Sequence, residues 1–212
     1  LNLEWHGNDE NTIGVNSLNG QKIIAIDKNG SWFLGEASEL LENAHDIHRV
    51  NIKKTNAVSL PEFNSSIGEN FTSLNKSKQE LSRVDVFFPI THGKNGEDGS
   101  LQGFLELVGK PYVGADVYGS AICMDKDVTK RLLQDHNIPV SKYKLLRNPD
   151  EVSFEHAANE LGHTLFVKPC REGSSIGISK VKNADEYVIA LERAFSVGRK
   201  VLIEEEIVGR EI

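Results

Sequence analysis

A lysine-bearing strand followed at once by a glycine- and serine-rich loop constrains this chain more than any other feature. Residues 165–169 are apolar around Lys168, the loop Cys170–Gly177 comes next, and a second apolar run covers 178–181. This order predicts a hairpin whose loop N–H groups and hydroxyls surround phosphate oxygens, with glycine allowing close approach. A Walker A loop would instead lead into a helix and read GxxxxGK[ST]. An ordinary polar hairpin turn is the alternative.

Two further segments are candidates for the same ligand. Lys126 follows a Met-Asp pair at the start of a predicted helix, where the helix N-terminus already favours anions. Glu204, Glu205 and Glu206 end a strand, and such carboxylates accept hydrogen bonds from an adenine amino group or ribose hydroxyls at the edge of a nucleotide cleft. A solvated helix lysine and a solvated acidic patch are the alternatives.

His92 is the candidate for contact with a smaller substrate. It directly follows an apolar strand and precedes Gly93, so its side chain can reach a substrate carboxylate or amine. A loop histidine with only structural hydrogen bonds is the alternative. The neighbouring Glu97 and Asp98 are predicted to cap the helix that follows them.

The first half of the chain is predicted to begin with a hairpin and to continue less regularly. Residues 22–26 and 31–34 are apolar runs separated by an Asn-Gly turn, which predicts strand, turn and strand. Residues 36–44 have helical spacing of apolar side chains. Residues 51–80 are rich in Asn, Ser and Lys, which predicts a surface excursion that has room for one exposed strand.

A more regular pattern begins at residue 84. Residues 84–90 have the composition of a buried strand, 101–108 have helical spacing with Gly109 as a C-cap, and 111–114 form a short apolar run. This strand–loop–helix–strand order favours a parallel sheet. Ligands of such sheets bind at the carboxyl ends of the strands, where the loop 92–99 lies.

The second half alternates strands and helices. Predicted helices cover 125–136, 154–161 and 184–195, and predicted strands cover 143–146, 165–169, 178–181 and 201–203. The first pattern ends near residue 120. The sequence therefore predicts two domains, 1–120 and 121–212.

Composition excludes several classes of function. The net charge of −7 and pI near 5.5 argue against nucleic acid as a partner, because phosphate backbones require a basic field. No apolar run approaches the roughly 20 residues of a membrane span. Cys123 and Cys170 lie far apart and outside any metal-ligand spacing, which predicts reduced cysteines in a cytosolic protein. The start has no signal-peptide pattern and no Met, so we expect a truncated chain.

Taken together, the motifs resemble the D-alanine–D-alanine ligase family of ATP-grasp enzymes. The resemblance is strong over residues 84–212 and looser over 26–32. The matching stretches are His92-Gly93 with Gly96-Glu97-Asp98-Gly99 and Gln102-Gly103; Pro111-Tyr112-Val113-Gly114; Met124-Asp125-Lys126 with Thr129-Lys130; Val167-Lys168-Pro169 with Glu172-Gly173-Ser174-Ser175; and Val201-Leu202-Ile203-Glu204 with Gly209-Arg210-Glu211.

The resemblance implies an α/β fold with a truncated N-terminal parallel-sheet domain, pre-ATP-grasp and Rossmann-like, over 1–120. A central ATP-grasp subdomain with the phosphate lid loop follows over 121–212. It implies a two-step ligation for peptidoglycan precursor synthesis. ATP phosphorylates the carboxylate of one D-alanine, and the amine of a second D-alanine then displaces phosphate. The family also implies a cytoplasmic homodimer that binds small molecules and neither nucleic acid nor membrane.

The resemblance assigns roles residue by residue. Lys126 and Lys168 would bind the nucleotide phosphates, and Ser174 would orient substrate and phosphate from the lid. His92 would lie at the D-alanine pocket. The remaining nucleotide contacts would come from the lid, the hinge and the adenine and ribose sites, namely Glu172, Gly173, Ser175, Glu204, Glu206, Ile207 and Glu211.

Two departures from the family pattern limit what this chain is expected to do. It lacks the glycine-rich opening segment whose glutamate anchors the first D-alanine, and it stops before the third domain that supplies the Mg²⁺ ligands and an arginine. We therefore expect no metal ligands in this chain and no turnover by this polypeptide alone. The alternatives are a D-alanine–D-lactate or D-alanine–D-serine ligase, another ATP-grasp carboxylate–amine ligase, and a non-catalytic nucleotide-binding fragment.

Overall fold

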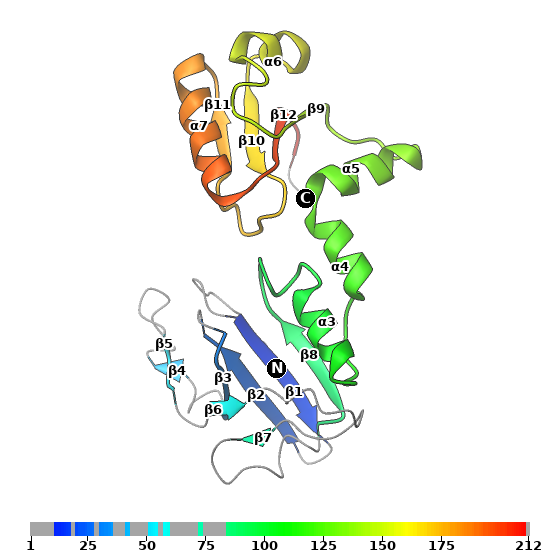
Figure 1. Cartoon of the computed structure of the whole chain (residues 1–212). Helices are drawn as coiled ribbons and strands as arrows, with labels where there is room; N and C mark the ends of the chain where they lie inside the picture. The colour runs from blue at the N-terminus through cyan, green and yellow to red at the C-terminus, as the bar shows by residue number, and fades with distance from the viewer. Residues whose placement is uncertain are drawn as a thin grey trace. The chain divides into compact units, whose positions relative to one another are not determined.

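The computed structural model describes residues 11–17, 20–27, 30–35, 41–42, 51–54, 57–59, 72–73 and 84–210. The chain divides into two compact units, whose elements are labelled in Figure 1. The first comprises Leu1–His92 and Gly99–Val117, and the second comprises Gly93–Asp98 and Tyr118–Ile212. None of the helices in the described stretches combines the length and the apolar character needed to cross a bilayer.

The first unit is built on a six-stranded sheet with the order β7-β6-β3-β2-β1-β8. Its strands are β1 (Asn11–Ser17), β2 (Gly20–Ile26), β3 (Trp32–Gly35), β6 (Ala57–Ser59), β7 (Thr72–Ser73) and β8 (Val86–Ile90). The predicted hairpin is confirmed, because Ile26 pairs with Trp32 in antiparallel register. The turn closes through a 2.9 Å bond from Gly30 N to Asp27 O, and Gly30 adopts a φ of 79°, which glycine tolerates without a Cβ clash.

The pairing within this sheet corrects the expectation of a parallel sheet. All its described strand pairs are antiparallel. Among the described residues the one parallel contact is a bridge between Phe87 and Tyr112, at the two ends of the segment on which the expectation rested. Short connections such as residues 27–31 join neighbouring strands directly and impose antiparallel pairing, whereas parallel neighbours need a crossover of about a dozen residues. The α/β class is confirmed, but the parallel topology is limited to this bridge.

Two other expectations for the first unit need correction. Within the predicted helix 36–44, Leu41–Glu42 form strand β4, which pairs with β5 (Asn51–Ile52); the rest of that helix lies outside the described residues. Four apolar positions in a short window do not separate a helix from a paired strand. The expected surface excursion contributes buried side chains, because Ile52 and Val58 are each 7% exposed.

Strand β8 and helix α3 (Ser100–Leu107) position the loop that carries His92. Phe87 on β8 and Leu105 on α3 are fully buried in the same core cluster. β8 is the last strand in the sheet order, and Phe88 is 45% exposed, so the strand is buried on one side only rather than throughout. Gly109 follows the C-cap Val108 with a φ of 66°, as a helix-ending glycine does. The predicted strand 111–114 is reduced to the bridge at Tyr112.

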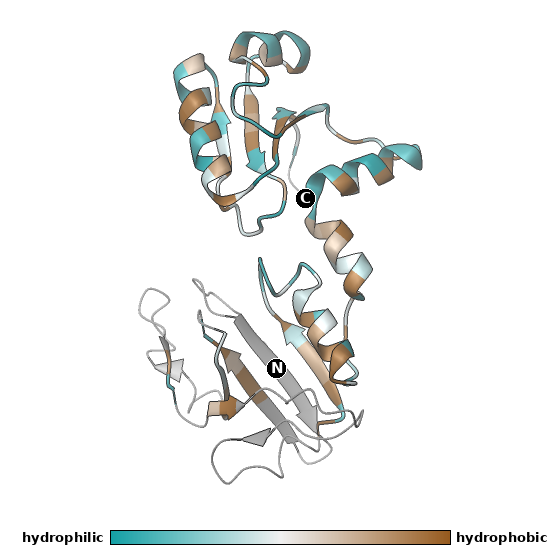
Figure 2. Ribbon diagram, in the orientation of Figure 1, coloured by the Kyte–Doolittle hydropathy of each residue, from teal (hydrophilic) through white to brown (hydrophobic). Residues whose placement is uncertain are grey.

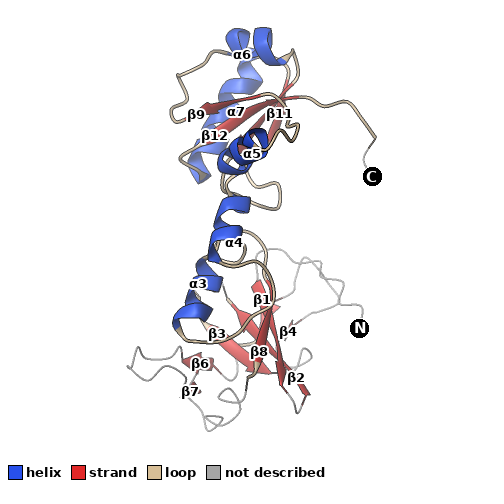
Figure 3. Cartoon of the chain, turned by 90° about the vertical axis from the view of Figure 1, so that its right-hand side faces the viewer, coloured by secondary structure: helices blue, strands red, loops and turns tan. Residues whose placement is uncertain are grey.

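The second unit holds a four-stranded antiparallel sheet with the order β11-β10-β12-β9. Its strands are β9 (Tyr143–Leu146), β10 (Leu165–Pro169), β11 (Ser179–Val181) and β12 (Val201–Glu205), as the sequence predicts. Helices α6 (Phe154–Leu161) and α7 (Ala184–Val197) pack against one face (Figure 3). Because side chains alternate along a strand, Val167 and Ile203 enter this core, while Lys168 and Glu204 project from the other face.

The helices of the second unit begin where side-chain caps are available. Ser153 caps α6 and Asn183 caps α7, and Asp125 caps α5 (Lys126–Asp135). These three helices confirm the sequence prediction. Figure 2 shows α5 largely hydrophilic, whereas apolar and hydrophilic colours alternate around α7. Helix α4 (Val117–Met124) was not predicted, because its short apolar stretch has no clear amphipathic spacing.

Candidate functional site

A buried carboxylate between two lysines forms the centre of the candidate site. Glu204 on β12 is 6% exposed, and its two oxygens accept from Lys168 Nζ at 2.6 Å and Lys130 Nζ at 3.1 Å. Burial favours the neutral carboxyl, but the hydrogen bonds and charges of Lys168 and then Lys130 outweigh it and lower the pKa of Glu204. The site therefore holds an ionised carboxylate with two cations.

Lys126 belongs to the same site. Its ammonium donates to Glu172 O at 2.6 Å, and its backbone N–H donates to Cys170 O at 3.0 Å. Burial lowers the pKa of Lys126 most, and the nearby charge of Lys168 lowers it further. Because the charges of Lys168 and Glu204 both act on Lys126, the two lysines identified from the sequence lie in one electrostatic environment rather than in separate regions of solvent.

Lys130 lies in a stretch that resembles the family, but no site role was predicted for it from the sequence. It lies on α5, four residues after Lys126, and residues at this spacing share a helix face. Besides Glu204, its ammonium contacts Ser141 Oγ at 2.7 Å and lies 5.1 Å from the centre of the Tyr143 ring. The spacing from Lys126 was the available signal, but only the fold shows that this helix face meets β12.

The lid loop, which we define as residues 170–178, connects β10 to β11. The two strands pair antiparallel with Val167 opposite Ser179, which confirms the predicted hairpin. Ser174 and Ser175 adopt left-handed φ values of 47° and 60°, a conformation that costs a non-glycine residue roughly 1–2 kcal/mol. Both residues are exposed, and neither hydroxyl has a hydrogen-bond partner among the described residues. Backbone strain of this kind often accompanies ligand binding.

The lid packs closely on the loop 93–98 within the second unit. A Cβ placed on Gly173 would lie 3.3 Å from Gly93 Cα, so glycine permits this approach. Glu97 accepts a short hydrogen bond from Gly93 N, and Asp98 accepts from Asn95 N at 3.0 Å. The expectation that Glu97 and Asp98 cap α3 is wrong, because the N-cap is Gly99 and the cap has no side-chain hydrogen bond. These carboxylates instead hold their own loop together.

The other residues identified from the sequence are less closely connected. Glu206 pairs with Lys180 at the sheet edge, Ile207 is 68% exposed, and Glu211 lies outside the described residues. His92 is exposed and belongs to the first unit, at the end of β8. Among the residues that the structure describes, no group of three or more His, Cys, Asp or Glu side chains could hold a metal. Cys123 and Cys170 are both free thiols.

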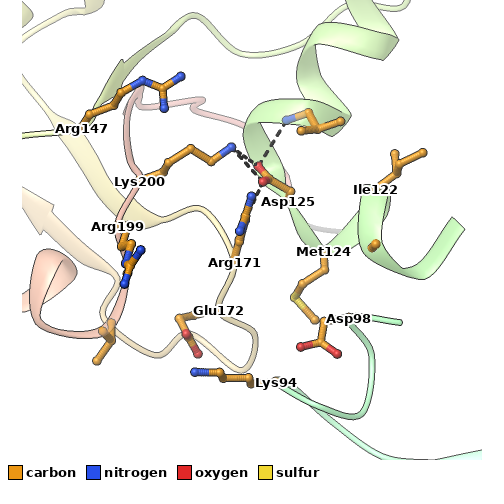
Figure 4. Close-up of a pocket in the computed structure, with 14 residues that line it drawn as sticks. Lys94, Asp98, Ile122, Met124, Asp125, Arg147, Arg171, Glu172, Arg199 and Lys200 are labelled. Atoms are coloured by element: carbon orange, nitrogen blue, oxygen red, sulfur yellow. Dashed lines mark hydrogen bonds and ion pairs between the residues drawn. The ribbon is translucent and has the colours of Figure 1, made fainter. Parts of the chain in front are cut away.

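A pocket of about 790 Å³ lies on another part of the second unit (Figure 4). Of the catalytic and nucleotide-binding candidates predicted from the sequence, only Glu172 is among its lining residues. Its wall also carries Asp125, Arg171 and Lys200, which the dashed lines in Figure 4 connect. Lys126, Lys168 and Glu204 do not line this pocket, so it is distinct from the lysine site.

Two family models match the chain in sequence order. The model for the D-ala D-ala ligase N-terminus matches residues 16–115, and the model for the D-ala D-ala ligase C-terminus matches residues 132–212. This chain belongs to the D-alanine–D-alanine ligase family. Lys168, the lid loop and Glu204 lie within the region that the second model matches, whereas Lys126 lies between the two matched regions.

Curated and solved ligases agree with this assignment. D-alanine–D-alanine ligase A of Escherichia coli K12 is 43% identical over 192 residues, covering 90% of this chain and 52% of the relative. The structure of the Coxiella burnetii D-alanine–D-alanine ligase has a TM-score of 0.71 at 33% identity, covering 88% of this chain and 54% of that one. This chain thus spans about half the length of the ligases it matches.

Two further structures bear on the ligand and the substrate. The VanG D-Ala:D-Ser ligase of Enterococcus faecalis has a TM-score of 0.65 at 36% identity, covering 88% of this chain and 52% of that one. A D-alanine–D-alanine ligase of Bacillus anthracis complexed with ATP has a TM-score of 0.53 at 35% identity. The match covers 61% of this chain and 43% of the Bacillus anthracis chain. One structural neighbour is thus named as a D-Ala:D-Ser ligase, and another is complexed with ATP.

Proposed function

We propose that the protein carrying this sequence joins two D-alanines in an ATP-dependent reaction that supplies a peptidoglycan precursor. The observation that carries the proposal is that Lys126 donates to Cys170 O and Glu172 O in the strained, serine-bearing lid that begins two residues after Lys168, in a chain of the D-alanine–D-alanine ligase family. Curated relatives named as D-alanine–D-alanine ligases support the reaction. We further propose a cytoplasmic homodimer that acts on small molecules.

The lysine site fits the triphosphate of ATP. Lys130 and Lys168 share the Glu204 carboxylate, and the Lys126 ammonium donates to the backbone oxygen of Glu172, so the ammonium groups at the site outnumber its ion-paired carboxylate. When ATP binds, phosphate oxygens would replace Glu172 O and the Glu204 carboxylate as the acceptors of the Lys126 and Lys168 ammonium groups. The new hydrogen bonds would be charge-assisted, as the present ones are. Glu204 keeps Lys168 extended across the sheet face before the nucleotide binds. The ATP complex of the Bacillus anthracis ligase supports this choice of ligand.

The lid supplies neutral donors to the same phosphates. The hydroxyls of Ser174 and Ser175 have no partner among the described residues, and Gly173 allows the backbone to approach a ligand. In the proposed reaction Ser174 orients the D-alanine carboxylate and the γ-phosphate. Glu172 lies at the base of the lid, and Glu206, Ile207 and Glu211 would line the hinge, adenine and ribose sites. Such a site acts by positioning and by charge stabilisation rather than by covalent chemistry.

The proposed reaction has two steps. A carboxylate oxygen of the first D-alanine attacks the γ-phosphorus, and ADP leaves with the bridging oxygen. The amine of the second D-alanine then attacks the acyl carbon, phosphate leaves, and the amine loses a proton as the peptide bond forms. His92, exposed at the end of β8, is proposed to contact D-alanine.

The described residues do not provide a binding site for Mg²⁺. They contain no suitable cluster of carboxylates or histidines, and Glu204 is already bound to two lysines. We propose that the Mg²⁺ ligands belong to the part of the ligase that this sequence does not cover.

The experiment is a phosphate-release assay on the full-length polypeptide that carries this sequence. We expect ATP hydrolysis to require D-alanine, L-alanine to be inactive, and mass spectrometry to detect D-alanyl-D-alanine. ATP binding with no stimulation by any D-amino acid would contradict the proposal and favour a non-catalytic nucleotide-binding protein.

The second candidate function is a ligase that uses D-serine or D-lactate as its second substrate. The likeness to the VanG D-Ala:D-Ser ligase favours the D-serine version. The same assay separates the candidates, because D-alanine with D-serine or D-lactate would then outcompete D-alanine alone and yield the mixed product.

A further inference from the structure

Asp125 connects three parts of the second unit through one buried carboxylate. The residue is 4% exposed and precedes Lys126 at the start of α5. Its Oδ2 accepts from Arg171 Nε at 2.8 Å, and its two oxygens accept from Lys200 Nζ at 2.8 and 2.9 Å. Figure 4 shows Arg171 and Lys200 approaching Asp125 from the lid side and from the start of β12.

Capping of α5 does not account for these contacts. The capping bond from Val128 N to Asp125 Oδ1 is long, at 3.4 Å, whereas both charged donors approach within 2.9 Å. An N-cap needs only one hydrogen bond to a neighbouring N–H and no distant partner. Arg171 is 70% exposed in its side chain, so the pairing does not arise from burial of the arginine either. What distinguishes Arg171 is its position in the lid.

Hydrogen bonds to backbone atoms also connect the base of the lid to the start of α5. Cys170 O accepts from Lys126 N, and Glu172 O accepts from Lys126 Nζ at 2.6 Å, on either side of Arg171. Cys170 N donates in turn to Lys200 O at 2.9 Å. The first three lid residues thus contact the N-cap and the first residue of α5, and the residue that precedes β12. A shift of the lid base would therefore move the Lys126 ammonium with it.

We propose that the Asp125–Arg171 ion pair is a positioning device that holds the base of the lid in register with Lys126. Arg171 is a positioning residue, because it acts through the lid and Lys126 rather than by touching the reacting atoms. Lys200 completes the device by neutralising Asp125 and Asp127 together, with a 2.9 Å contact to Asp127. The role in catalysis rests on the proposed function, whereas the mechanical connection does not.

Arg131 provides a matched control. It also pairs with a buried aspartate in the first turn of α5, through Nε to Asp127 Oδ1 at 3.1 Å, and its side chain is 61% exposed. Both ion pairs therefore join an exposed arginine to a buried aspartate near the start of α5. Arg131 differs because it lies on α5 itself and makes no contact with the lid among the described interactions. A general effect of losing an arginine from this cluster would appear in both variants.

The test compares Arg171→Ala, Arg171→Lys and Arg131→Ala in the full-length polypeptide. Amide hydrogen exchange at Lys126 and Cys170 is expected to accelerate about tenfold or more in Arg171→Ala, because the lid base opens more often, and to stay near the wild-type rate in Arg131→Ala. If the ligase reaction is confirmed, kcat for ATP turnover should fall about 10- to 100-fold in Arg171→Ala, since small misplacements of binding groups have effects of this size. Arg171→Lys should recover part of both effects.

The outcomes distinguish this inference from the proposed function. Equal exchange at Lys126 and Cys170 in the two alanine variants would overturn the positioning role, whatever the enzyme does. Unequal exchange in a protein without D-alanine-dependent turnover would keep the mechanical connection and reject the ligase proposal. Normal kcat in Arg171→Ala despite faster exchange would show that the register of the lid base does not matter for catalysis, and would also overturn the inference.

Discussion

The two faces of the sheet in the second unit serve different purposes although the same strands build them. On one face Leu165, Val167 and Ile203 are fully buried against α6 and α7. On the other face the next residues along the strands, Lys168 and Glu204, form an ion pair beside the lid. Since the side chains alternate with a period of two, a substitution can reach one face without altering the other. Stability and ligand binding should therefore be separable here residue by residue.

The largest expected effect is on the helix-facing side. Leu165→Ala should lower the free energy of unfolding by about 3–4 kcal/mol, because a fully buried leucine leaves both a lost transfer energy and a cavity. Urea denaturation of the 212-residue chain measures this. Val188→Ala is the control. Val188 is 55% exposed on α7, so its substitution should change the free energy of unfolding by less than about 0.5 kcal/mol. Similar losses in the two variants would mean that burial of Leu165 between the sheet and the helices contributes no more than the exposed position of Val188 on α7.

The second prediction compares the loss of activity when a lysine is removed from each face of the sheet. Lys168→Met should reduce kcat/KM for ATP about 100-fold in the full-length polypeptide, because a cation at the phosphates is lost, which corresponds to about 2.7 kcal/mol. Lys144→Met removes a lysine that pairs with Glu160 at 2.8 Å on the helix-facing side and should leave kcat/KM within about twofold. Steady-state kinetics would reject the contrast if both substitutions had equal effects.

A third prediction concerns acid stability. The pKa of Glu204 is lowered in the folded state, so this carboxylate contributes stability that is present above its unfolded pKa of about 4.3 and is lost as pH falls through the folded pKa. Glu204→Gln should therefore be less stable than wild type at neutral pH, and the difference should shrink below about pH 4. Urea midpoints measured between pH 3 and 7 test this.

Glu160 is the matched control for this pH dependence. Hydrogen bonding and the charge of Lys144 lower its pKa as well, but the group is exposed to solvent. Solvent screening makes exposed pairs weak, so Glu160→Gln should hardly change the pH profile of stability. Parallel pH profiles for the Glu204 and Glu160 variants would show that burial on the site face has no influence on the ion pair.

The smallest expected effect is in the lid. Ser175→Gly should stabilise the protein by about 0.5–1 kcal/mol, because relief of the left-handed φ of 60° exceeds the greater entropy of glycine in the unfolded chain. Ser179→Gly in β11 should destabilise it by about 0.5–1 kcal/mol, since glycine weakens a strand. Thermal unfolding of both variants gives the two signs; a loss of stability in Ser175→Gly would mean that the serine backbone is not strained.

Local patterns predicted most of the second unit. The caps Ser153 and Asn183, the closing Gly162 and the apolar runs of β10 and β12 are all encoded within a few residues, and each element is found close to its predicted position. The lid hairpin was predictable for the same reason. Lys126 and Lys168 were identified because each directly adjoins a helix start or a loop.

Pairings between separate segments were not predictable from local patterns. The antiparallel order of the first sheet and the pairing of Leu41–Glu42 with Asn51–Ile52 depend on which strands meet in the fold. The same limitation concealed Lys130 and Arg171, whose partners Glu204 and Asp125 lie far away in the sequence. Glu204 looked like one member of an exposed acidic run, and only its buried position reveals that it neutralises lysines.

The most direct test of the central claim is the protection of individual lysines by ATP. Lys126 and Lys168 should resist acetylation together as ATP is added to the full-length polypeptide, with the same half-saturating concentration, while the exposed Lys142 remains reactive throughout. Mass spectrometry resolves the three sites. Protection of one lysine without the other, or at clearly different ATP concentrations, would contradict a single nucleotide site beneath the lid.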